Sequence, residues 1–123
     1  MGTDLPIRSY KELEVWQKSK SFALALYKAT EIFPRAELYG LTGQIRRAGV
    51  SIPSNIAEGF RRRTAKEKTH FLRNAYGSGA ELETQLEISR DLGYLHPRDS
   101  EYLAAELDAI MRMLNKAIAS LGK

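Results

Sequence analysis

The stretch Glu37–Arg63, ELYGLTGQIRRAGVSIPSNIAEGFRRR, decides the fold of this chain. On a helix that turns by about 100° per residue, its apolar side chains recur at steps of three and four and share one face. These side chains are Leu41, Ile45, Ala48, Ile52, Ile56 and Phe60. Such a stripe predicts an amphipathic helix over about residues 37–61, with this face buried against other helices.

A row of polar side chains lies beside the stripe, again at steps of three and four. The row comprises Gln44, Arg47, Ser51, Asn55 and Glu58. Lysine and glutamate usually occupy a solvent-facing row, whereas these side chains hydrogen-bond in more restricted geometries. We interpret the row as a device for register and assembly, because a polar group with one possible partner specifies one alignment.

Pro53 lies in the middle of this helix and belongs with the residues assigned to structure and assembly. It lacks a backbone donor and clashes with the preceding turn, so it predicts a kink or a break. Ser51 and Asn55 are expected to be half-buried partners for the opened backbone. Arg47 and Glu58 lie too far apart to pair, so each is expected to have a partner on another helix or subunit.

The chain before this stretch predicts a helix over about residues 10–32. Ser9 and Glu12 match a capping box, in which both side chains satisfy free backbone N–H groups. Pro34 ends the helix, and Pro6 favours a short extended arm at residues 1–8. The apolar residues that recur at helical spacing are Val15, Trp16, Phe22, Ala23, Leu26 and Tyr27, and Trp16 is expected to face the core.

The chain after this stretch predicts two more helices, over about residues 65–92 and 98–121. Thr64 and Glu67 match a second capping box, and Gly93 suits the position after a helix end. Small residues in the middle of the first helix indicate that another helix approaches closely: Ala75, Gly77, Ser78, Gly79 and Ala80. A heptad-like seam marks the second helix: Leu103, Leu107, Ile110, Leu114, Ala117 and Leu121.

Four helical segments with short connections and no β-type alternation predict an all-α fold. The expected architecture is an antiparallel up-down four-helix bundle in one domain, with the second helix kinked near Pro53. The chain has 123 residues, of which 43% are hydrophobic, as in globular proteins. It contains no cysteine, and we identify neither a signal peptide nor a membrane-spanning run, so we expect a cytoplasmic protein without a membrane partner.

Residue types that carry chemistry appear only as fragments of known sites. Glu67 and His70 have the Glu-x-x-His spacing of a di-iron site, but no second copy exists, since His96 is expected in a loop. Ser51, Glu58 and His70 supply the residue types of a catalytic triad without a spacing that couples them. We therefore expect no catalytic residues, no metal and no cofactor, and a protein that is not an enzyme.

Positive charge is unevenly distributed along the chain. Residues 1–73 hold 14 Lys or Arg against 7 Asp or Glu, or +7, whereas residues 74–123 hold 5 against 8, or −3. Arginine binds phosphate in a bidentate manner, through two parallel N–H groups. The densest basic segment therefore predicts a nucleic-acid-binding surface. A solvated turn and salt bridges between subunits are the alternative interpretations. The candidate residues are Arg46, Arg47, Arg61, Arg62, Arg63 and Lys66.

Over almost its whole length, the sequence resembles the bacterial four-helix-bundle proteins encoded within intervening sequences of 23S ribosomal RNA genes. Its most specific segments are Q-I-R-R-A at residues 44–48 and S-I-P-S-N-I-A-E-G at residues 51–59. Gly49 and Gly79 depart from the pattern, since bulkier or hydroxyl residues are usual there. The other matching segments are residues 13–18, 27, 33–34, 37–43, 77–84 and 92–95.

The resemblance implies an up-down bundle that forms ring-shaped homopentamers and has no agreed catalytic residues. It also implies an architecture related to the accessory proteins of diversity-generating retroelements, which bind a reverse transcriptase and nucleic acid. We therefore expect a homopentamer that binds RNA or DNA through its basic surface. The alternative is a protein-interaction scaffold without a nucleic-acid ligand, in which the arginines face neighbouring subunits.

Overall fold

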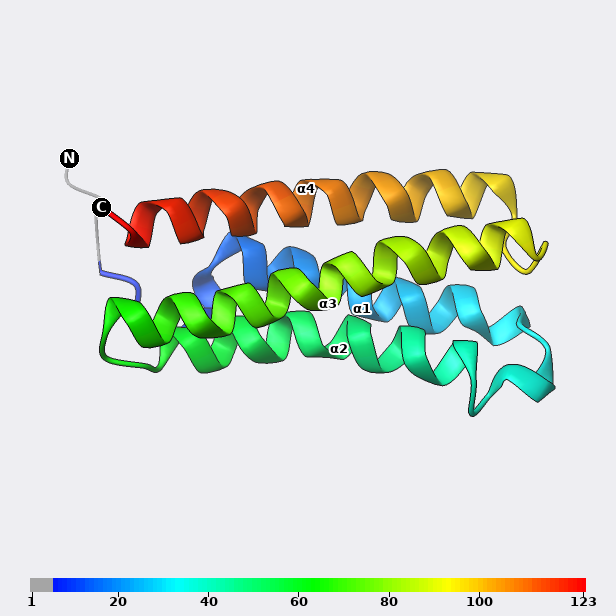
Figure 1. The fold of residues 1–123 in the computed structure, drawn as a ribbon, viewed down its shortest axis with the longest axis horizontal. Coiled ribbons are helices and arrows are strands. Elements are labelled where there is room, and N and C mark those ends of the chain that lie inside the picture. Colours follow the sequence, from blue (N-terminus) through cyan, green and yellow to red (C-terminus); the bar gives the residue numbers. More distant parts are fainter. Residues whose placement is uncertain (1–5) are drawn as a thin grey trace.

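The computed structural model describes residues 6–123 and confirms the predicted all-α fold (Figure 1). Within these residues there are four α-helices and no strand: α1 Glu14–Ala29, α2 Leu41–Phe60, α3 Ala65–Asp91 and α4 Pro97–Leu121. Three short 3₁₀ segments lie at Tyr10–Glu12 (η1), Thr30–Ile32 (η2) and Arg35–Glu37 (η3). None of the helices among residues 6–123 combines the length and apolar character that crossing a membrane requires.

The four helices lie side by side as a bundle. In Figure 1 the colours run in opposite directions along consecutive helices, so the chain reverses at each connection. α2 packs on α1 and α3, and α4 packs on α3 and α1, which closes the ring of four helices. The connections are short: Arg61–Thr64 joins α2 to α3, and Leu92–His96 joins α3 to α4. Of the expected arm at residues 1–8, residues 6–8 are not helical, and residues 1–5 lie outside the described part.

The first helix differs from the predicted segment at residues 10–32. The Ser9–Glu12 capping box is present, since the Lys11 N–H donates to Ser9 Oγ at 3.1 Å and the Ser9 N–H donates to Glu12 Oε2 at 3.0 Å. This capping box caps only the 3₁₀ turn η1 and not the long helix, because the backbone of Leu13 between them is extended, with ψ 128°. Leu13 and Val15 both pack against the core. Residues two apart on one helix face different directions, so the extended residue brings both to the same side.

The second helix begins at Leu41, four residues later than predicted. Gly40 precedes it with φ −113° and ψ −115°, outside the helical region. The side chain of Glu37 reaches over this residue, and its Oε1 accepts the free N–H of Leu41 at 3.2 Å. At the other end, the Lys68 ammonium donates to the carbonyl of Phe60 at 3.0 Å. Both ends of α2 are therefore satisfied by side chains from outside the helix.

Pro53 does not break α2, which continues from Leu41 to Phe60, so that alternative was wrong; the kink stays a prediction. A proline at this position leaves the carbonyl of Gly49 without its usual donor. Asn55 is half-buried as expected, but its amide donates to the carbonyl of Ser51 at 2.9 Å instead. Asn55 therefore reinforces the turn around the proline rather than replacing the bond that the proline removes.

The middle residues of the predicted apolar stripes on α2 and α4 are buried in the core, whereas the residues at the stripe ends are only half-buried. Leu41 and Phe60, at the two ends of the stripe on α2, are half-buried, as are Ala117 and Leu121 at the end of α4. Trp16 is also half-buried at the edge of the core, with its ring 5.2 Å from that of Tyr10. The largest fully buried side chains are Phe22, Leu26, Ile45, Ile52, Ile56, Leu82, Leu103, Leu107, Ile110 and Leu114.

Only part of the small middle of α3 faces a neighbouring helix. A Cβ atom at Gly79 would overlap the sulfur of Met111 on α4, so this glycine permits close packing. A Cβ atom at Gly77 would meet nothing within 4 Å, so the same expectation was wrong there. On α2, a Cβ at Gly49 would lie 2.6 Å from Leu26 Cδ1. Larger residues on the partner helices thus fill the space that Gly49 and Gly79 leave.

Gly93 ends α3 in the manner predicted. Its φ of +79° lies in the left-handed region, which glycine adopts without steric cost. The N–H of Gly93 donates to the carbonyl of Arg90 and that of Tyr94 donates to Ser89, each at 2.9 Å, which is the hydrogen-bond pair of a Schellman motif. Pro97 is the first residue of α4, where its missing N–H has no consequence.

Candidate nucleic-acid interface

The six predicted basic residues occupy two separate places rather than one surface. Arg46 and Arg47 lie in the second turn of α2, whereas Arg61, Arg62 and Arg63 follow its last residue. At 1.5 Å per helical residue, the two groups are roughly 22 Å apart along the bundle. We call residues 61–68 the α2–α3 junction. This segment comprises the arginine triplet and the first turn of α3.

Arg46 is held by α1. Its Nε donates to Thr30 Oγ1 at 2.9 Å, and one terminal nitrogen donates to the carbonyl of Tyr27 at 3.2 Å. The guanidinium also lies 4.7 Å from the ring centre of Tyr27. A positive charge at the C-terminal end of α1 is stabilised by the free carbonyls and the negative end of the helix dipole there. Arg46 therefore ties α1 to α2 and is poorly placed to bind a phosphate.

Arg62 is also held within the protein. Its guanidinium pairs with Glu58 at 2.7 Å and lies 4.7 Å from the ring centre of Phe71 on α3. The expectation that Glu58 pairs with another helix or subunit was therefore wrong, since its partner lies four residues further along the same segment. Arg62 is half-buried, unlike its two neighbours in the arginine triplet.

Four of the five cations at the α2–α3 junction form no ion pair within residues 6–123, and one of the four, Lys68, donates to the carbonyl of Phe60. Arg61, Arg63 and Lys66 are exposed, and none takes part in the five ion pairs formed among residues 6–123. The nearby carboxylates are occupied: Glu58 by Arg62, and Glu67 by the hydroxyl of Thr64 at 2.9 Å. Residues 61–68 hold five Lys or Arg against one Glu, so the junction keeps a net charge of +4.

The second predicted capping box is present in its first half. The N–H of Glu67 donates to Thr64 Oγ1 at 3.1 Å, as expected for the cap of α3. The carboxylate of Glu67 accepts from the Thr64 hydroxyl rather than from the Thr64 backbone N–H. The cap fixes where α3 begins, and with it the position of Lys66 in the first turn.

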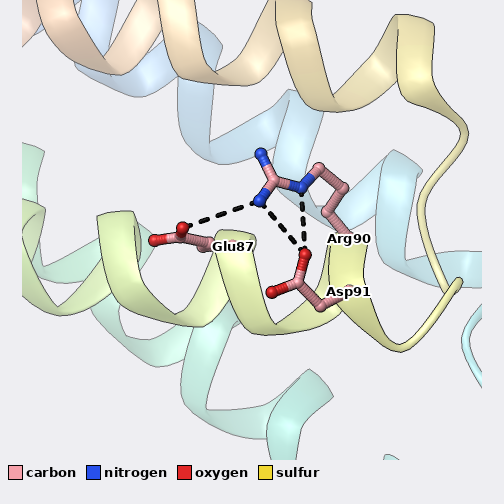
Figure 2. A network of polar contacts seen from close by, with 3 residues as sticks. All are labelled: Glu87, Arg90 and Asp91. Atoms are coloured by element: carbon pink, nitrogen blue, oxygen red, sulfur yellow. Dashed lines mark hydrogen bonds and ion pairs between the residues drawn. The ribbon is translucent and has the colours of Figure 1, made fainter.

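Cations elsewhere in the chain show the contrasting arrangement. Arg90 lies between Glu87 and Asp91 near the end of α3, and its guanidinium reaches both carboxylates, at 3.6 and 3.1 Å (Figure 2). Arg112 pairs with Asp108 at 2.9 Å on the same face of α4. These pairs neutralise positive charge in the second half of the chain, in keeping with its net charge of −3 over residues 74–123.

The centre of the polar row joins α2 to α3. Ser78 Oγ donates to Ser51 Oγ at 2.8 Å, and the amide of Asn55 donates to the same oxygen at 2.9 Å. Gln44 and Arg47 lie on the exposed side of this network. Together with α3 they line a polar groove of about 250 Å³, which we call the α2–α3 groove. Its lining residues are Gln44, Arg47, Ala48, Ser51, Ser78, Glu81 and Gln85.

The α3 side of this groove was missed in the sequence. Ser78, Glu81 and Gln85 recur at steps of three and four, the signal that identified the row on α2. Ser78 belongs to the small segment expected to face another helix, but Glu81 and Gln85 lie among glutamates typical of an exposed face. Gln85 Oε1 is buried and has no hydrogen-bond partner among the described residues. Gln85 lines the groove, but this oxygen is itself buried and does not face a ligand there.

The fragments of metal and triad chemistry are not assembled. Within residues 6–123, no group of three or more His, Cys, Asp or Glu side chains is placed to hold a metal ion. His70 lies beside Asn74 and Phe71, at a 3.5 Å contact and a 5.1 Å ring separation. Ser51 and Glu58 have the partners described above, so no hydrogen bond couples these two and His70 among the described residues.

Tyr94 and Glu37 form a contact that the sequence did not indicate. The Tyr94 hydroxyl, in the α3–α4 connection, donates to Glu37 Oε2 at 3.1 Å, while the other carboxylate oxygen caps α2. The hydrogen bond to Glu37 raises the pKa of Tyr94 above its ordinary value of 10.0, and partial burial and the negative charge of Glu37 act in the same direction. The Tyr94 ring lies 5.4 Å from that of Phe33.

An apolar surface covers the outer side of α1 and α2. Tyr27, Leu38 and Val50 are 44%, 45% and 43% exposed and line a second groove together with Gly43, Arg46 and Arg47. Leu24, one turn before Tyr27 on α1, is 63% exposed. Contiguous exposed apolar side chains are typical of surfaces that another protein covers.

No curated protein matches the chain. Among solved structures, a protein of unknown function from the S23 ribosomal protein family of Bacteroides thetaiotaomicron superposes with a TM-score of 0.79 and 24% identity, covering 85% of this chain and 95% of that one. At this identity the likeness establishes the fold alone. The sequence pattern of the 23S rRNA-intervening sequence protein family matches residues 11–116, and the chain belongs to that family.

Proposed function

We propose that this protein is a non-enzymatic, cytoplasmic, homo-oligomeric bundle, most simply a pentamer, that binds RNA or DNA through the α2–α3 junction. One observation carries the proposal: Arg61, Arg63 and Lys66 are exposed within six residues, and none of them forms an ion pair within residues 6–123. Of the six basic residues expected to bind phosphate, these three and Arg47 remain available. Arg46 and Arg62 support the fold instead.

Phosphate chemistry suits this arrangement. Arginine binds a phosphate through two parallel N–H groups, and lysine adds a point charge. A symmetric oligomer would repeat the cluster in every subunit and form a continuous band of positive charge. Binding to several phosphates releases condensed counterions, so the affinity of such a band would fall steeply with salt.

The apolar surface on α1 and α2 supports the assembly part of the proposal. Tyr27, Val50 and Leu38 lie around one groove, and a second copy of the chain would remove them from water. None of the residues that line this groove belongs to residues 61–68, so assembly through it leaves the junction accessible but covers Arg47. The substitution Val50→Glu should therefore lower the mass in light scattering. Exposed Leu92, at the end of α3, provides the control Leu92→Glu.

A salt titration of RNA binding tests the proposed ligand. For single strands, each phosphate that a cation of the protein neutralises adds about 0.7 to the steepness of the log–log plot of the binding constant against salt. The double variant Arg63→Ala/Lys66→Ala should therefore bind more weakly, with a slope about 1.4 less steep. The control Arg98→Ala/Lys116→Ala removes the same charge from α4 and should leave the slope unchanged. Failure of the wild-type protein to bind at low salt would refute the proposal.

The apolar surface also favours a second candidate function, a protein-interaction scaffold whose basic residues face other subunits. Under this alternative, Arg61→Ala lowers the oligomeric mass measured by light scattering. Under the proposed function, the mass is unchanged and RNA affinity falls. Arg62→Ala does not discriminate between the two, because removing its interactions with Glu58 and Phe71 would destabilise the bundle itself.

A further inference from the structure

An apolar groove opens at the end of the bundle where α2 ends, α3 begins and α4 ends (Figure 1). Leu13 and all four helices contribute to its wall, and its volume is about 270 Å³. The fully buried side chain of Ile56 lines it, so the groove reaches into the core. Of its lining residues, only Lys68 and Ser120 have polar side chains. We call this site the end groove.

Small residues on two helices leave space at this end of the bundle. Gly59 on α2 and Ala117 on α4 both line the end groove, between the half-buried rings and side chains that finish the apolar stripes. Apolar walls that face water favour an apolar occupant. A cavity of about 150 Å³ holds the six carbons of benzene, so by proportion the end groove has room for roughly ten carbons.

Lys68 is the one ionisable side chain that lines the end groove. Its ammonium is held beside Phe60, another lining residue: it donates to the Phe60 carbonyl at 3.0 Å and lies 5.7 Å from the ring centre. An ammonium has three donors, and Lys68 takes part in none of the ion pairs among residues 6–123. It is also the last residue of the α2–α3 junction, whose net charge is +4. This edge of the groove therefore favours a negatively charged group.

We propose that the end groove binds a free medium-chain fatty acid of roughly eight to ten carbons. The alkyl chain would lie along the apolar wall, and the carboxylate would accept from the Lys68 ammonium at the edge. No carboxylate lines the groove to repel this head group. A phosphate ion lacks the chain that the walls favour, and the two acyl chains of a phospholipid exceed the volume. The proposal is independent of nucleic-acid binding.

The test measures dissociation constants of hexanoate, octanoate, decanoate and dodecanoate by isothermal titration calorimetry. The full-length protein is used, and each probe stays below its micelle concentration. Up to decanoate, each added methylene should tighten binding by about two- to fourfold, because it is removed from water. The gain should then level off, because the groove is full. Decan-1-ol has the same chain without the charge and should bind about three- to fivefold more weakly than decanoate.

Two variants separate the chain from the head group. Ala117→Phe fills the groove and should abolish saturable decanoate binding, whereas Ala119→Phe, at an exposed position that does not line it, should preserve binding. Lys68→Met should bring decanoate and decan-1-ol to equal affinity. Because Lys68 also bonds the end of α2, retained decan-1-ol binding verifies that the groove is intact in this variant. Exposed Lys116→Met is the charge control and should keep the preference for decanoate.

Each result has one interpretation. A length series that levels off near decanoate, and that is lost in Ala117→Phe but kept in Ala119→Phe, supports the proposal. Absence of saturable decanoate binding by the wild-type protein overturns it, and a lower oligomeric mass of Ala117→Phe in light scattering would then assign the groove to a contact between copies. An affinity that rises at the same rate from decanoate to dodecanoate also overturns it, since general adsorption has no length limit. Equal binding of decanoate and decan-1-ol by the wild-type protein overturns the role of Lys68 and with it the choice of an anion.

Discussion

The hydroxyl of Ser78 on α3 donates a hydrogen bond to the hydroxyl of Ser51 on α2, with 2.8 Å between the oxygens. The same Ser51 oxygen accepts the amide of Asn55, and this amide also bonds the Ser51 carbonyl. Sliding α3 by one turn would separate the two hydroxyls and leave buried Ser78 without an acceptor. The pair therefore favours one register between α2 and α3.

Ser51→Ala should lower the free energy of unfolding by roughly 1–2 kcal/mol, because the hydroxyl of buried Ser78 loses its acceptor. Urea denaturation monitored by circular dichroism measures this loss. The double variant Ser51→Ala/Ser78→Ala should be less destabilised than the sum of the two single variants, because no unpaired hydroxyl remains. Strict additivity of the two effects would contradict a direct coupling.

Two glycines in neighbouring helices should respond oppositely to the same substitution. At Gly77, an added Cβ meets nothing within 4 Å, so Gly77→Ala should stabilise the protein by about 0.5–1 kcal/mol through helix propensity. At Gly59, the Cβ would lie 3.2 Å from Phe71 Cβ and 3.3 Å from the Lys68 carbonyl, atoms that cannot rotate away. Gly59→Ala should therefore destabilise by about 1–3 kcal/mol, which thermal unfolding of both variants would check.

Arg46→Ala should lower the stability of the bundle while leaving the salt dependence of RNA binding unchanged. Its hydrogen bonds to Thr30 and to the Tyr27 carbonyl involve a charged donor, and their loss should cost about 1–3 kcal/mol. Arg46→Lys keeps the charge but not the two-pronged geometry, so it should restore only part of the stability. A reduced salt slope in Arg46→Ala at full stability would instead place Arg46 among the residues that bind phosphate.

The helices were predictable because hydrophobic spacing is a local property. The last two helices lie within one residue of the predicted bounds, since a threonine cap, Gly93 and Pro97 mark their ends. The first two differ for reasons that involve distant residues. Leu13 is extended so that it can share the core with Val15, and α2 starts late at a cap supplied by Glu37.

The candidate site was less predictable because it depends on which charges find partners. Arg46 and Arg63 look equivalent in the sequence, yet one is held by Thr30 across the α1–α2 interface and the other is exposed. A charge count assigns both to one basic surface. Gln85 was missed for the same reason, since its unused carbonyl becomes apparent only when α2 packs beside α3.

Tyr94 should make the stability of the protein fall in alkaline solution. Its hydrogen bond to Glu37 raises the pKa of the folded protein's Tyr94 above the ordinary value of 10.0. The protonated hydroxyl therefore stabilises the fold fully below the unfolded-state pKa, and this contribution disappears as pH rises through the folded-state pKa. Above that range, a phenolate would face the carboxylate of Glu37, which also caps α2.

Tyr94→Phe should remove this contribution, so the variant is less stable near neutral pH and loses less stability than the wild-type protein as pH rises past 10.0. Melting temperatures measured across the alkaline range provide the comparison. Tyr39→Phe is the matched control, because Tyr39 is 96% exposed, and its profile should follow that of the wild-type protein. Parallel alkaline profiles for Tyr94→Phe and the wild-type protein would show that the bond to Glu37 does not couple Tyr94 ionisation to folding.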